Sequence, residues 1–318
     1  MVGSRPIDVG KMIHVIGNAA VDTVIRVDRF PRPGETIVAL GASEDLGGKG
    51  LNQAVVAARC AAPVRLVAAV GPDVLAERIR SSLAREGVLT DGLATSTYGT
   101  DRCVITVDRQ GENTILSLVD AARNFDPAAE TPLDKWILPG DWAVLQGNLR
   151  PDVTRDCLAL AKSKGATTAL NPSPTYPADE YDWTLVDLAV LNRSEALELA
   201  GDVDVEHAAH NLLDKGAGAV VVTLGGEGCV FFSASDAFRV AALKIQAVDT
   251  VGAGDVFCGT LTAARVLGLG WKESLGVATE AASASTARAG VLASFPSRVE
   301  MARLLKRPAM MSLEEHRR

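Results

Sequence analysis

Aromatic residues are scarce in this chain, since Phe, Trp and Tyr together make up only 4% of its 318 residues. The core must therefore be built from Ala, Val and Leu, as is common in parallel sheets that are covered by helices. A hydrophobic content of 47% is sufficient for one large α/β domain, with or without a small appendage.

Paired cysteines and clustered histidines are also missing. The five cysteines are odd in number and widely spaced, and none of them forms a Cys-x-x-Cys pair. The four histidines show no spacing typical of metal ligands. Isolated cysteines in apolar surroundings usually act as small buried hydrophobic residues. We therefore expect no structural zinc site and a reducing, cytoplasmic compartment.

The sequence contains 32 Lys and Arg residues and 39 Asp and Glu residues, so it has no excess of positive charge. Binding to a nucleic-acid backbone needs a basic face, so we expect no nucleic-acid partner. A phosphorylated nucleotide stays compatible with this charge, because local dipoles or a bound cation can offset it. No apolar run approaches the ~18 residues of a spanning helix, and residues 1–11 lack a signal-peptide core; we expect no membrane association.

From Trp142 onward, strand-like and helix-like segments alternate along the chain. Such alternation is typical of a parallel sheet with helices on both faces. We therefore predict an α/β fold with three layers, αβα, around a mainly parallel central sheet. Residues 12–305 are expected to form this single domain, and the charged residues 306–318 a flexible tail.

Two segments of the first half have the pattern of β-hairpins, with alternating strands on either side of a polar turn. Their strands are expected at 23–30 and 36–40, and at 100–107 and 112–119. We expect the two hairpins, within about 20–45 and 98–120, to form one small sheet that projects from the larger domain.

A glycine motif, Gly252-Ala253-Gly254, stands between the strand-like segment Phe238–Ala247 and an apolar, helix-like segment. Glycine permits close approach to a ligand, and a helix that begins after Gly252 would direct free N–H groups toward an anion. Asp255 would be stabilised as an anion by the same helix dipole. An anion site that also holds a base is what phosphoryl transfer to a hydroxyl requires. The alternative is an ordinary strand-to-helix turn with an Asp near its N-cap.

A second glycine cluster, Gly47-Gly48-Lys49-Gly50, also opens an apolar helix, expected over Leu51–Arg59. Neither cluster has the spacing of a Walker A loop or a Rossmann fingerprint. In parallel sheets the ligand lies beyond the carboxyl ends of the strands. The polar candidates that follow predicted strands are Asp22, Gly48, Asn148, Asn171, Asn192, Gly225 and Asp255.

These motifs resemble those of a known family. The segment Asp249–Asp255, with Phe257 and Gly259, is similar to the C-terminal signature of the ribokinase-like (PfkB) carbohydrate kinases, and Gly47–Ala54 to their N-terminal signature. Two further motifs, Asn192–Glu195 and Thr223–Gly228, stand between them in the family's order. The resemblance covers about residues 13 to 305. It implies a ribokinase-like fold with the small sheet as a lid, and ATP-dependent transfer of a γ-phosphate to a primary hydroxyl of a sugar.

The resemblance also implies roles for single residues. Asp255 would be the general base, and the main chain of Gly252, Ala253 and Gly254 would hold the transferring phosphoryl charge. The residues implied to bind the sugar are Asp22, Gly48, Lys49, Asn52 and Asn148, together with Asp255. The residues implied to bind the nucleotide are Asn192, Glu195, Thr223, Gly225, Gly228, Thr279 and Ser283.

The same resemblance implies two bound cations, Mg²⁺ and K⁺, and a second copy of the chain as partner. Glu195 would order Mg²⁺ through water, which fits the reluctance of this ion to lose its hydration shell. A K⁺ ion would be bound mostly by backbone carbonyls, with the Ser294 hydroxyl as one ligand. The matching positions are Asp249, Val251, Ser285, Arg288, Gly290 and Ser294. By analogy, a homodimer formed through the β lid is expected.

Two positions depart from the pattern of ribokinases. Ala20 stands where they typically carry Asn, and Asn148 stands at the position of a sugar-binding Glu. Such losses would leave ribose hydroxyls poorly paired, so the expected substrate is not plain D-ribose. A nucleoside kinase of the same superfamily stays open, as does a catalytically idle sugar-binding or regulatory relative. Lys49 and Asn52 could also be ordinary surface residues, and Glu195 a first-turn helix acid.

Overall fold

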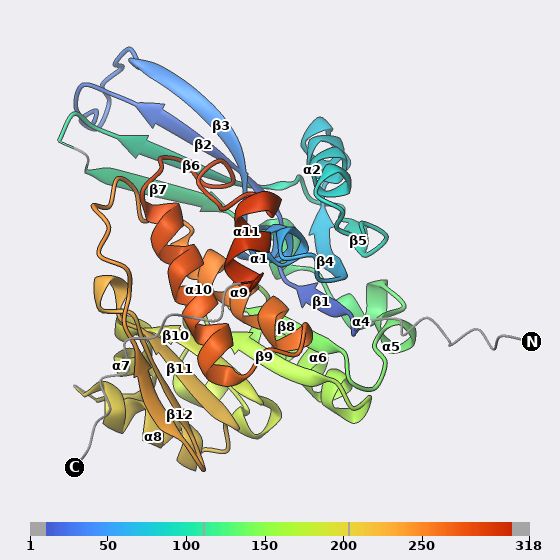
Figure 1. Cartoon of the computed structure of the whole chain (residues 1–318). Coiled ribbons are helices and arrows are strands. Elements are labelled where there is room, and N and C mark those ends of the chain that lie inside the picture. The colour runs from blue at the N-terminus through green and yellow to red at the C-terminus, as the bar shows by residue number, and fades with distance from the viewer. Residues whose placement is uncertain (1–10, 111, 203, 307–318) are drawn as a thin grey trace, which may run out of the picture.

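Two β-sheets organise the chain (Figure 1). The computed structural model describes residues 11–306 except 111 and 203. In this part of the chain the larger sheet has nine strands in the order β13-β12-β11-β10-β9-β8-β1-β4-β5. They are β1 Ile13–Ile16, β4 Val64–Val70, β5 Leu93–Thr95, β8 Trp142–Gln146, β9 Thr167–Asn171, β10 Leu188–Asn192, β11 Ala219–Thr223, β12 Cys229–Ser233 and β13 Ala237–Val240.

Most neighbouring strands of the large sheet run parallel, and within the described part of this sheet only β12 pairs antiparallel, with β11 and with β13. Successive residues of a strand point to opposite faces, and both faces here are apolar. On β8, for example, Val144 packs into one core while Ala143 and Leu145 pack into the other. The prediction of a three-layer αβα fold with a mainly parallel sheet is confirmed.

Helices cover both faces of this sheet. The first face carries α1 Lys49–Arg59, α2 Val74–Arg85, α9 Ala253–Val266, α10 Trp271–Thr286 and α11 Arg298–Lys306. The second carries α3 Asp120–Arg123, α4 Pro127–Glu130, α5 Leu133–Trp136, α6 Pro151–Ser163, α7 Arg193–Ala200 and α8 Val205–Asp214. Within the described residues, no helix is both long and apolar enough to cross a membrane.

Helices α1 and α9 pack closely, and a glycine makes this contact possible. A Cβ built on Gly259 of α9 would lie 2.7 Å from the main-chain oxygen of Gln53 on α1. The helix that follows each predicted glycine cluster therefore packs against the helix that follows the other. Both clusters lie at the amino ends of these helices, which brings them to the same edge of the sheet.

The smaller sheet projects from the large one and has the strand order β3-β2-β6-β7 (Figure 1). Its strands are β2 Ala20–Arg26, β3 Gly41–Gly47, β6 Asp101–Val107 and β7 Asn113–Leu118. We call this four-stranded sheet the lid. The parallel pairing of β2 with β6 joins the two predicted hairpins, and it aligns Asp22 with Cys103.

The predicted strand at 36–40 is wrong, because the second strand of the first hairpin is Gly41–Gly47. This register buries the side chain of Leu46, which is 4% exposed. Val38 and Leu40, whose alternation suggested a strand, remain 88% and 59% exposed. The strand predicted over 238–247 is also too long, because β13 ends at Val240. The predicted flexible tail lies outside the described residues, apart from Lys306 at the end of α11.

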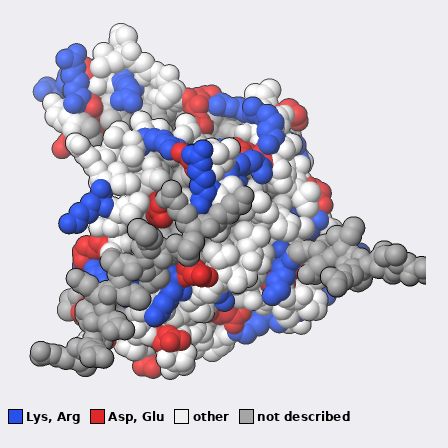
Figure 2. All heavy atoms as spheres, in the orientation of Figure 1, with Lys and Arg blue, Asp and Glu red and all other residues white. Residues whose placement is uncertain are grey.

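Charged side chains of both signs are interspersed over the face shown in Figure 2. Blue and red groups alternate over its visible part rather than gathering into one basic patch. On the lid, Glu44 of β3 pairs with Arg78 of the neighbouring α2 at 3.0 Å and lies 3.6 Å from Arg102 of β6.

Candidate active site

Asp255 lies in the first turn of α9, and its carboxylate is 5% exposed. Asn52 Nδ2 donates to its Oδ2 at 2.9 Å, and Gln53 Nε2 donates to its Oδ1 at 3.1 Å. Lys49 Nζ lies 3.7 Å from the same Oδ1. Three neighbours on α1 therefore hold a buried carboxylate through charge-assisted contacts. The Asp255 carboxylate in turn raises the pKa of Lys49 above its usual value.

The amino end of α9 has the geometry of an anion site. Gly252 is the N-cap residue with φ of 78°, in the left-handed region that glycine adopts without strain. Among the described residues no side chain caps this helix end. The Ala253 N–H donates to Thr250 O at 3.3 Å, which leaves the N–H groups of Gly254 and Asp255 as the free donors of the first turn. With Lys49 beside them, these groups can bind a phosphoryl anion.

A cleft of about 550 Å³ opens in front of this helix end. All of the residues predicted to bind a nucleotide line it, namely Asn192, Glu195, Thr223, Gly225, Gly228, Thr279 and Ser283. Lys49, Ala253 and Gly254 line the same cleft. The structure therefore places the predicted nucleotide residues and the anion site in one continuous space.

Asn192 and Glu195 form a reciprocal capping box at the start of α7. Asn192 Oδ1 accepts from the Glu195 N–H at 2.9 Å, and Glu195 Oε2 accepts from the Asn192 N–H at 2.8 Å. Glu195 therefore does act as a first-turn helix acid, the alternative considered from the sequence. It is compatible with a second role, because the cap uses only one Glu195 oxygen and the residue still lines the cleft.

Of the predicted sugar residues, Gly48, Lys49 and Asn52 lie at the amino end of α1, and Asp22 lies on the lid strand β2. Asn52, at 5% exposure, is buried rather than a surface residue, and its Oδ1 has no partner among the described residues. Gly48 holds φ of 91°, and a Cβ there would crowd Ala19 and Ala20. Asp22 on β2 packs on Gly47, where a Cβ would lie 2.1 Å from Asp22 Oδ2.

Burial raises the pKa of Asp22 to about 6 from 3.8, with smaller contributions from the carboxylates of Asp45 and Asp255. Between about pH 4 and pH 6 the folded state therefore holds a proton that the unfolded state has lost. Stability must fall as the pH rises through this window.

We accordingly expect Asp22→Asn to raise the free energy of unfolding at pH 8 by about 1–2 kcal/mol, after allowing for solvent screening. At pH 4.5 the gain should largely vanish, because wild-type Asp22 is then protonated in the folded state. Urea unfolding at both pH values measures this difference. An equal effect of the substitution at the two pH values would contradict the assignment.

The segments predicted to hold K⁺ lie together. Asp249 accepts from Val251 N at 3.0 Å through Oδ1 and from Gly290 N at 3.1 Å through Oδ2. Both Asp249 oxygens therefore have main-chain donors, and the Arg288 guanidinium pairs with Glu300. These contacts fit a site in which main-chain carbonyls are the chief ligands. Within the described residues, no group of three His, Cys, Asp or Glu side chains is placed to hold a metal ion.

The remaining predicted K⁺ positions, Ser285 and Ser294, are buried. Ser285 Oγ donates to Ala282 O and Ser294 Oγ donates to Val291 O, each at 2.8 Å. A hydroxyl that donates its proton to the main chain keeps its lone pairs for a cation. The donor chemistry of both serines is therefore suitable for K⁺.

Sequence patterns do not indicate several of the residues that line the cleft. The segment that follows β13 was predicted as a strand, yet Ala242, Leu243, Ile245 and Ala247 line the cleft instead. Its loose alternation of apolar residues provides this wall, and pairing with a sheet was the wrong interpretation of it. Gln53, adjacent to Asn52 in the second glycine motif, was not recognised as a neighbour of Asp255.

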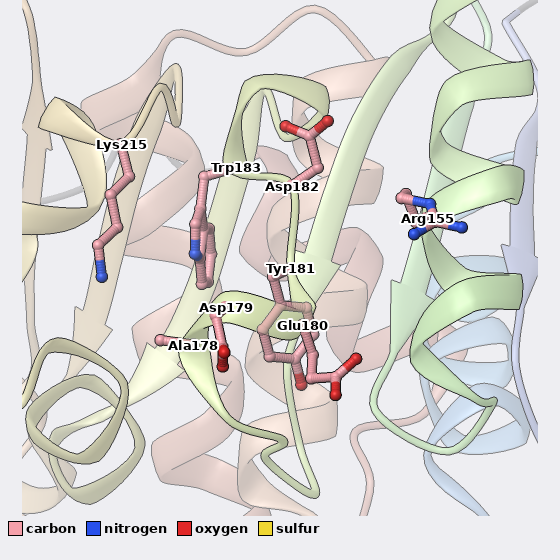
Figure 3. Close-up of a pocket in the computed structure, with 8 residues that line it drawn as sticks. All are labelled: Arg155, Ala178, Asp179, Glu180, Tyr181, Asp182, Trp183 and Lys215. Carbon is pink, nitrogen blue, oxygen red and sulfur yellow. The ribbon is translucent and has the colours of Figure 1, made fainter.

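A second hollow, of about 670 Å³, lies elsewhere on the molecule (Figure 3). It is lined by Arg155, Ala178, Asp179, Glu180, Tyr181, Asp182, Trp183 and Lys215. The segment 178–183 precedes β10 and Lys215 precedes β11, so this hollow lies at the amino ends of the strands. Ligands of parallel sheets bind at the opposite edge, and the three acids of this hollow outnumber its two bases, Arg155 and Lys215. The cleft before α9 is therefore the candidate active site.

The parallel sheet, the uncapped glycine-rich helix end and the buried carboxylate beside a lysine define a phosphotransferase with an alcohol group as acceptor. The chain belongs to the pfkB family of carbohydrate kinases, whose model matches residues 11–298. It is 30% identical over 303 residues to the ribokinase of Haemophilus influenzae, covering 93% of this chain and 99% of that protein.

Solved structures agree with this membership. The ribokinase of Thermotoga maritima superposes with a TM-score of 0.84 at 28% identity, covering 93% of this chain and 100% of the other. The Arabidopsis thaliana ribokinase complexed with ribose and ATP gives a TM-score of 0.83 at 25% identity, covering 93% and 99%. The recognition of the family from its motifs is confirmed.

Proposed function

We propose that this protein is an ATP-dependent sugar kinase, which transfers the γ-phosphate of ATP to a primary hydroxyl of a sugar other than plain D-ribose. The observation that carries the proposal is the position of Asp255. Its carboxylate lies where the uncapped amino end of α9 meets α1, and it contacts both Asn52 and Lys49 of α1. A base at this junction can deprotonate a hydroxyl beside a bound phosphate.

The reaction divides among the residues of the site. Asp255 accepts the proton of the attacking hydroxyl, and the oxygen then forms its bond to the γ-phosphorus while the bond to ADP breaks. The main-chain N–H groups at Gly252, Ala253 and Gly254 stabilise the charge on the transferring group. Lys49 lies beside both the carboxylate and the cleft, where it neutralises phosphate charge.

ATP would occupy the cleft of about 550 Å³, whose lining supports this assignment. Gly225 and Gly228 permit close backbone approach, and the apolar side chains of Leu243 and Ile245 suit a nucleotide base. Glu195 keeps one carboxylate oxygen outside its capping contact, and that oxygen could bind a water of a Mg²⁺ ion. When bound, Mg²⁺ neutralises charge on the phosphates, and K⁺ beside Asp249 would add positive field to the anion site.

The expected substrate preference rests on two residues at predicted sugar-binding positions, Ala20 and Asn148. Ala20 is buried and has no polar group to offer a hydroxyl. Asn148 Oδ1 is buried without a hydrogen-bond partner among the described residues, so it can accept from a sugar hydroxyl. An amide offers one accepting oxygen and one donating nitrogen where a carboxylate offers two acceptors. Selection of a different hydroxyl pattern from that of D-ribose is therefore expected.

The lid would close over the sugar and exclude water from the transfer. Its exposed apolar side chains, among them Leu116 and Leu118 at 66% and 55%, support a homodimer through this sheet. Sedimentation velocity on the purified protein tests the dimer, with Leu116→Arg as the variant that should dissociate it. A monomer at all concentrations would refute this assembly.

Release of ADP from MgATP against a panel of pentoses, hexoses, polyols and nucleosides tests the function. Each acceptor is assayed with K⁺ and with Na⁺, and we expect one neutral sugar to react, faster in K⁺. Reaction with a nucleoside alone would replace the proposal by a nucleoside kinase. ATP binding without any transfer would indicate a catalytically idle relative.

A further inference from the structure

Gln53 is fully buried on α1 and makes three hydrogen bonds with side chains from three other elements. Its Nε2 donates to Asp255 Oδ1 on α9 and to Asn171 Oδ1 at the end of β9, each at 3.1 Å. Its Oε1 accepts from Gln146 Nε2 on β8 at 2.9 Å. Every polar atom of this amide is therefore engaged, although none of the predicted roles involves it.

The direction of these hydrogen bonds is fixed by the main chain. Asn171 Nδ2 donates to the carbonyl of Val190 at 2.9 Å, which leaves Asn171 Oδ1 to face Gln53. Only the Nε2 group of Gln53 can donate to that oxygen, so its Oε1 must face Gln146. A flipped Gln53 amide would set its oxygen against the oxygens of Asn171 and Asp255. The side chain consequently has one orientation, with a donor aimed at Asp255.

Close packing holds Gln53 at this position. Gly259 lets α9 approach the main chain of Gln53, because a Cβ at position 259 would lie only 2.7 Å from the main-chain oxygen of Gln53. Gln146 has no exposed surface, and its Oε1 lies 1.9 Å from the position of a Cβ on Gly17. That oxygen has no hydrogen-bond partner in the described part of the chain. Leaving this buried acceptor unpaired costs stability. We therefore expect a functional reason for the three linked amides of Gln53, Asn171 and Gln146.

We propose that Gln53 is a positioning residue, which fixes the rotation of the Asp255 carboxylate and favours its ionised form. A primary amide does not titrate, so it donates to Asp255 Oδ1 at every pH. This hydrogen bond stabilises the carboxylate and holds its plane against the attacking hydroxyl. The inference deepens the proposed function, because it rests on Asp255 acting as the base.

The test replaces Gln53 by Met, which has a similar volume but donates no hydrogen bond. We expect kcat to fall about 10–100-fold, the range found for partners that orient a functional group, with the KM for MgATP within about twofold. The acid limb of the pH–rate profile should move upward, because the carboxylate loses a donor. Thr262→Val is the matched control, because Thr262 is also buried on α9 and its hydroxyl donates to the main-chain oxygens of Cys258 and Gly259 in its own helix. This variant should keep the parent's profile.

Gln53→Glu provides a second, independent variant if Gln53→Met does not fold. It keeps the size of the side chain but sets a carboxylate against Asp255, so the acid limb should move upward by more than in Gln53→Met. A purely structural role would lower the melting temperature of either variant and leave the acid limb in place. An unmoved acid limb in the folded variants would overturn the inference.

A double-mutant cycle shows whether Gln53 acts through Asp255. Adding Gln53→Met to Asp255→Asn should lower the residual transfer by less than about twofold, because the base is already missing. A loss as large as in the parent background would overturn the inference. Failure of the proposed function looks different, because the parent enzyme itself would then phosphorylate no acceptor of the panel.

Discussion

Asp255→Asn should abolish most phosphoryl transfer, with kcat reduced by about 10²–10⁴-fold, the contribution typical of a general base. The amide has the same size as the carboxylate, and its oxygen can still accept from Asn52 or Gln53. It has no basic oxygen to take the proton of the attacking hydroxyl. Binding of sugar and MgATP should therefore survive within a few-fold, as measured by equilibrium titration beside the steady-state assay.

The matched control for this variant is Asp204→Asn at the start of α8. Asp204 is exposed and caps its helix by accepting from Glu206 N and His207 N. Asn caps helices about as well as Asp, so this variant should keep both stability and activity. If Asp255→Asn retained transfer within a few-fold of the parent, Asp255 would not be the base.

The parts of the site that could be predicted from the sequence are local in the chain. The motif Gly252-Ala253-Gly254 specifies its own geometry, because Gly252 adopts φ of 78° and the helix starts at the next residue. The same holds for the capping box of Asn192 and Glu195, whose two members are three residues apart. Short-range patterns of this kind carry their structural consequence with them.

Contacts between distant segments were not predictable in this way. Gln53 and Asp255 are 202 residues apart, and only the packing of α1 on α9 brings them together. The register of the lid is a second example. The alternation at 36–40 satisfied a strand pattern, but the sheet used Gly41–Gly47 because that pairing buries Leu46. Burial against partners decides between two plausible strands, and the sequence of one strand does not contain its partners.

The uncapped end of α9 leads to a second large effect, expected for Gly254→Ala. Gly254 lies in the first turn of α9 and lines the cleft, and apart from its chain neighbours and its own helix backbone no described atom lies within 4 Å of a Cβ built on it. The added methyl group would therefore stand in the cleft, where the phosphoryl group has to approach the N–H groups. We expect kcat/KM for MgATP to fall about 10²-fold, comparable to the loss of one donor to a transition-state anion.

Stability should move in the opposite direction in this variant. Replacing Gly by Ala inside a helix typically stabilises it by about 0.5–1 kcal/mol, and nothing in the described structure collides with the new Cβ. Gly41→Ala at the exposed start of β3 is the control, because apart from its chain neighbours no described atom lies within 4 Å of its Cβ either. This variant should leave turnover unchanged. Gly259→Ala provides the contrast, since its Cβ collides with Gln53 and should lower the melting temperature.

The three variants together separate the two reasons for glycine in this helix. If Gly254→Ala lowered both the melting temperature and kcat/KM, the loss of activity would come from impaired folding. The result would then not support a phosphate-binding role for the amino end of α9. If it kept its melting temperature and lost transfer, the open space before Gly254 would be needed by the nucleotide phosphates. Glycine at 254 would then serve the approach of a ligand, and glycine at 259 the approach of a helix.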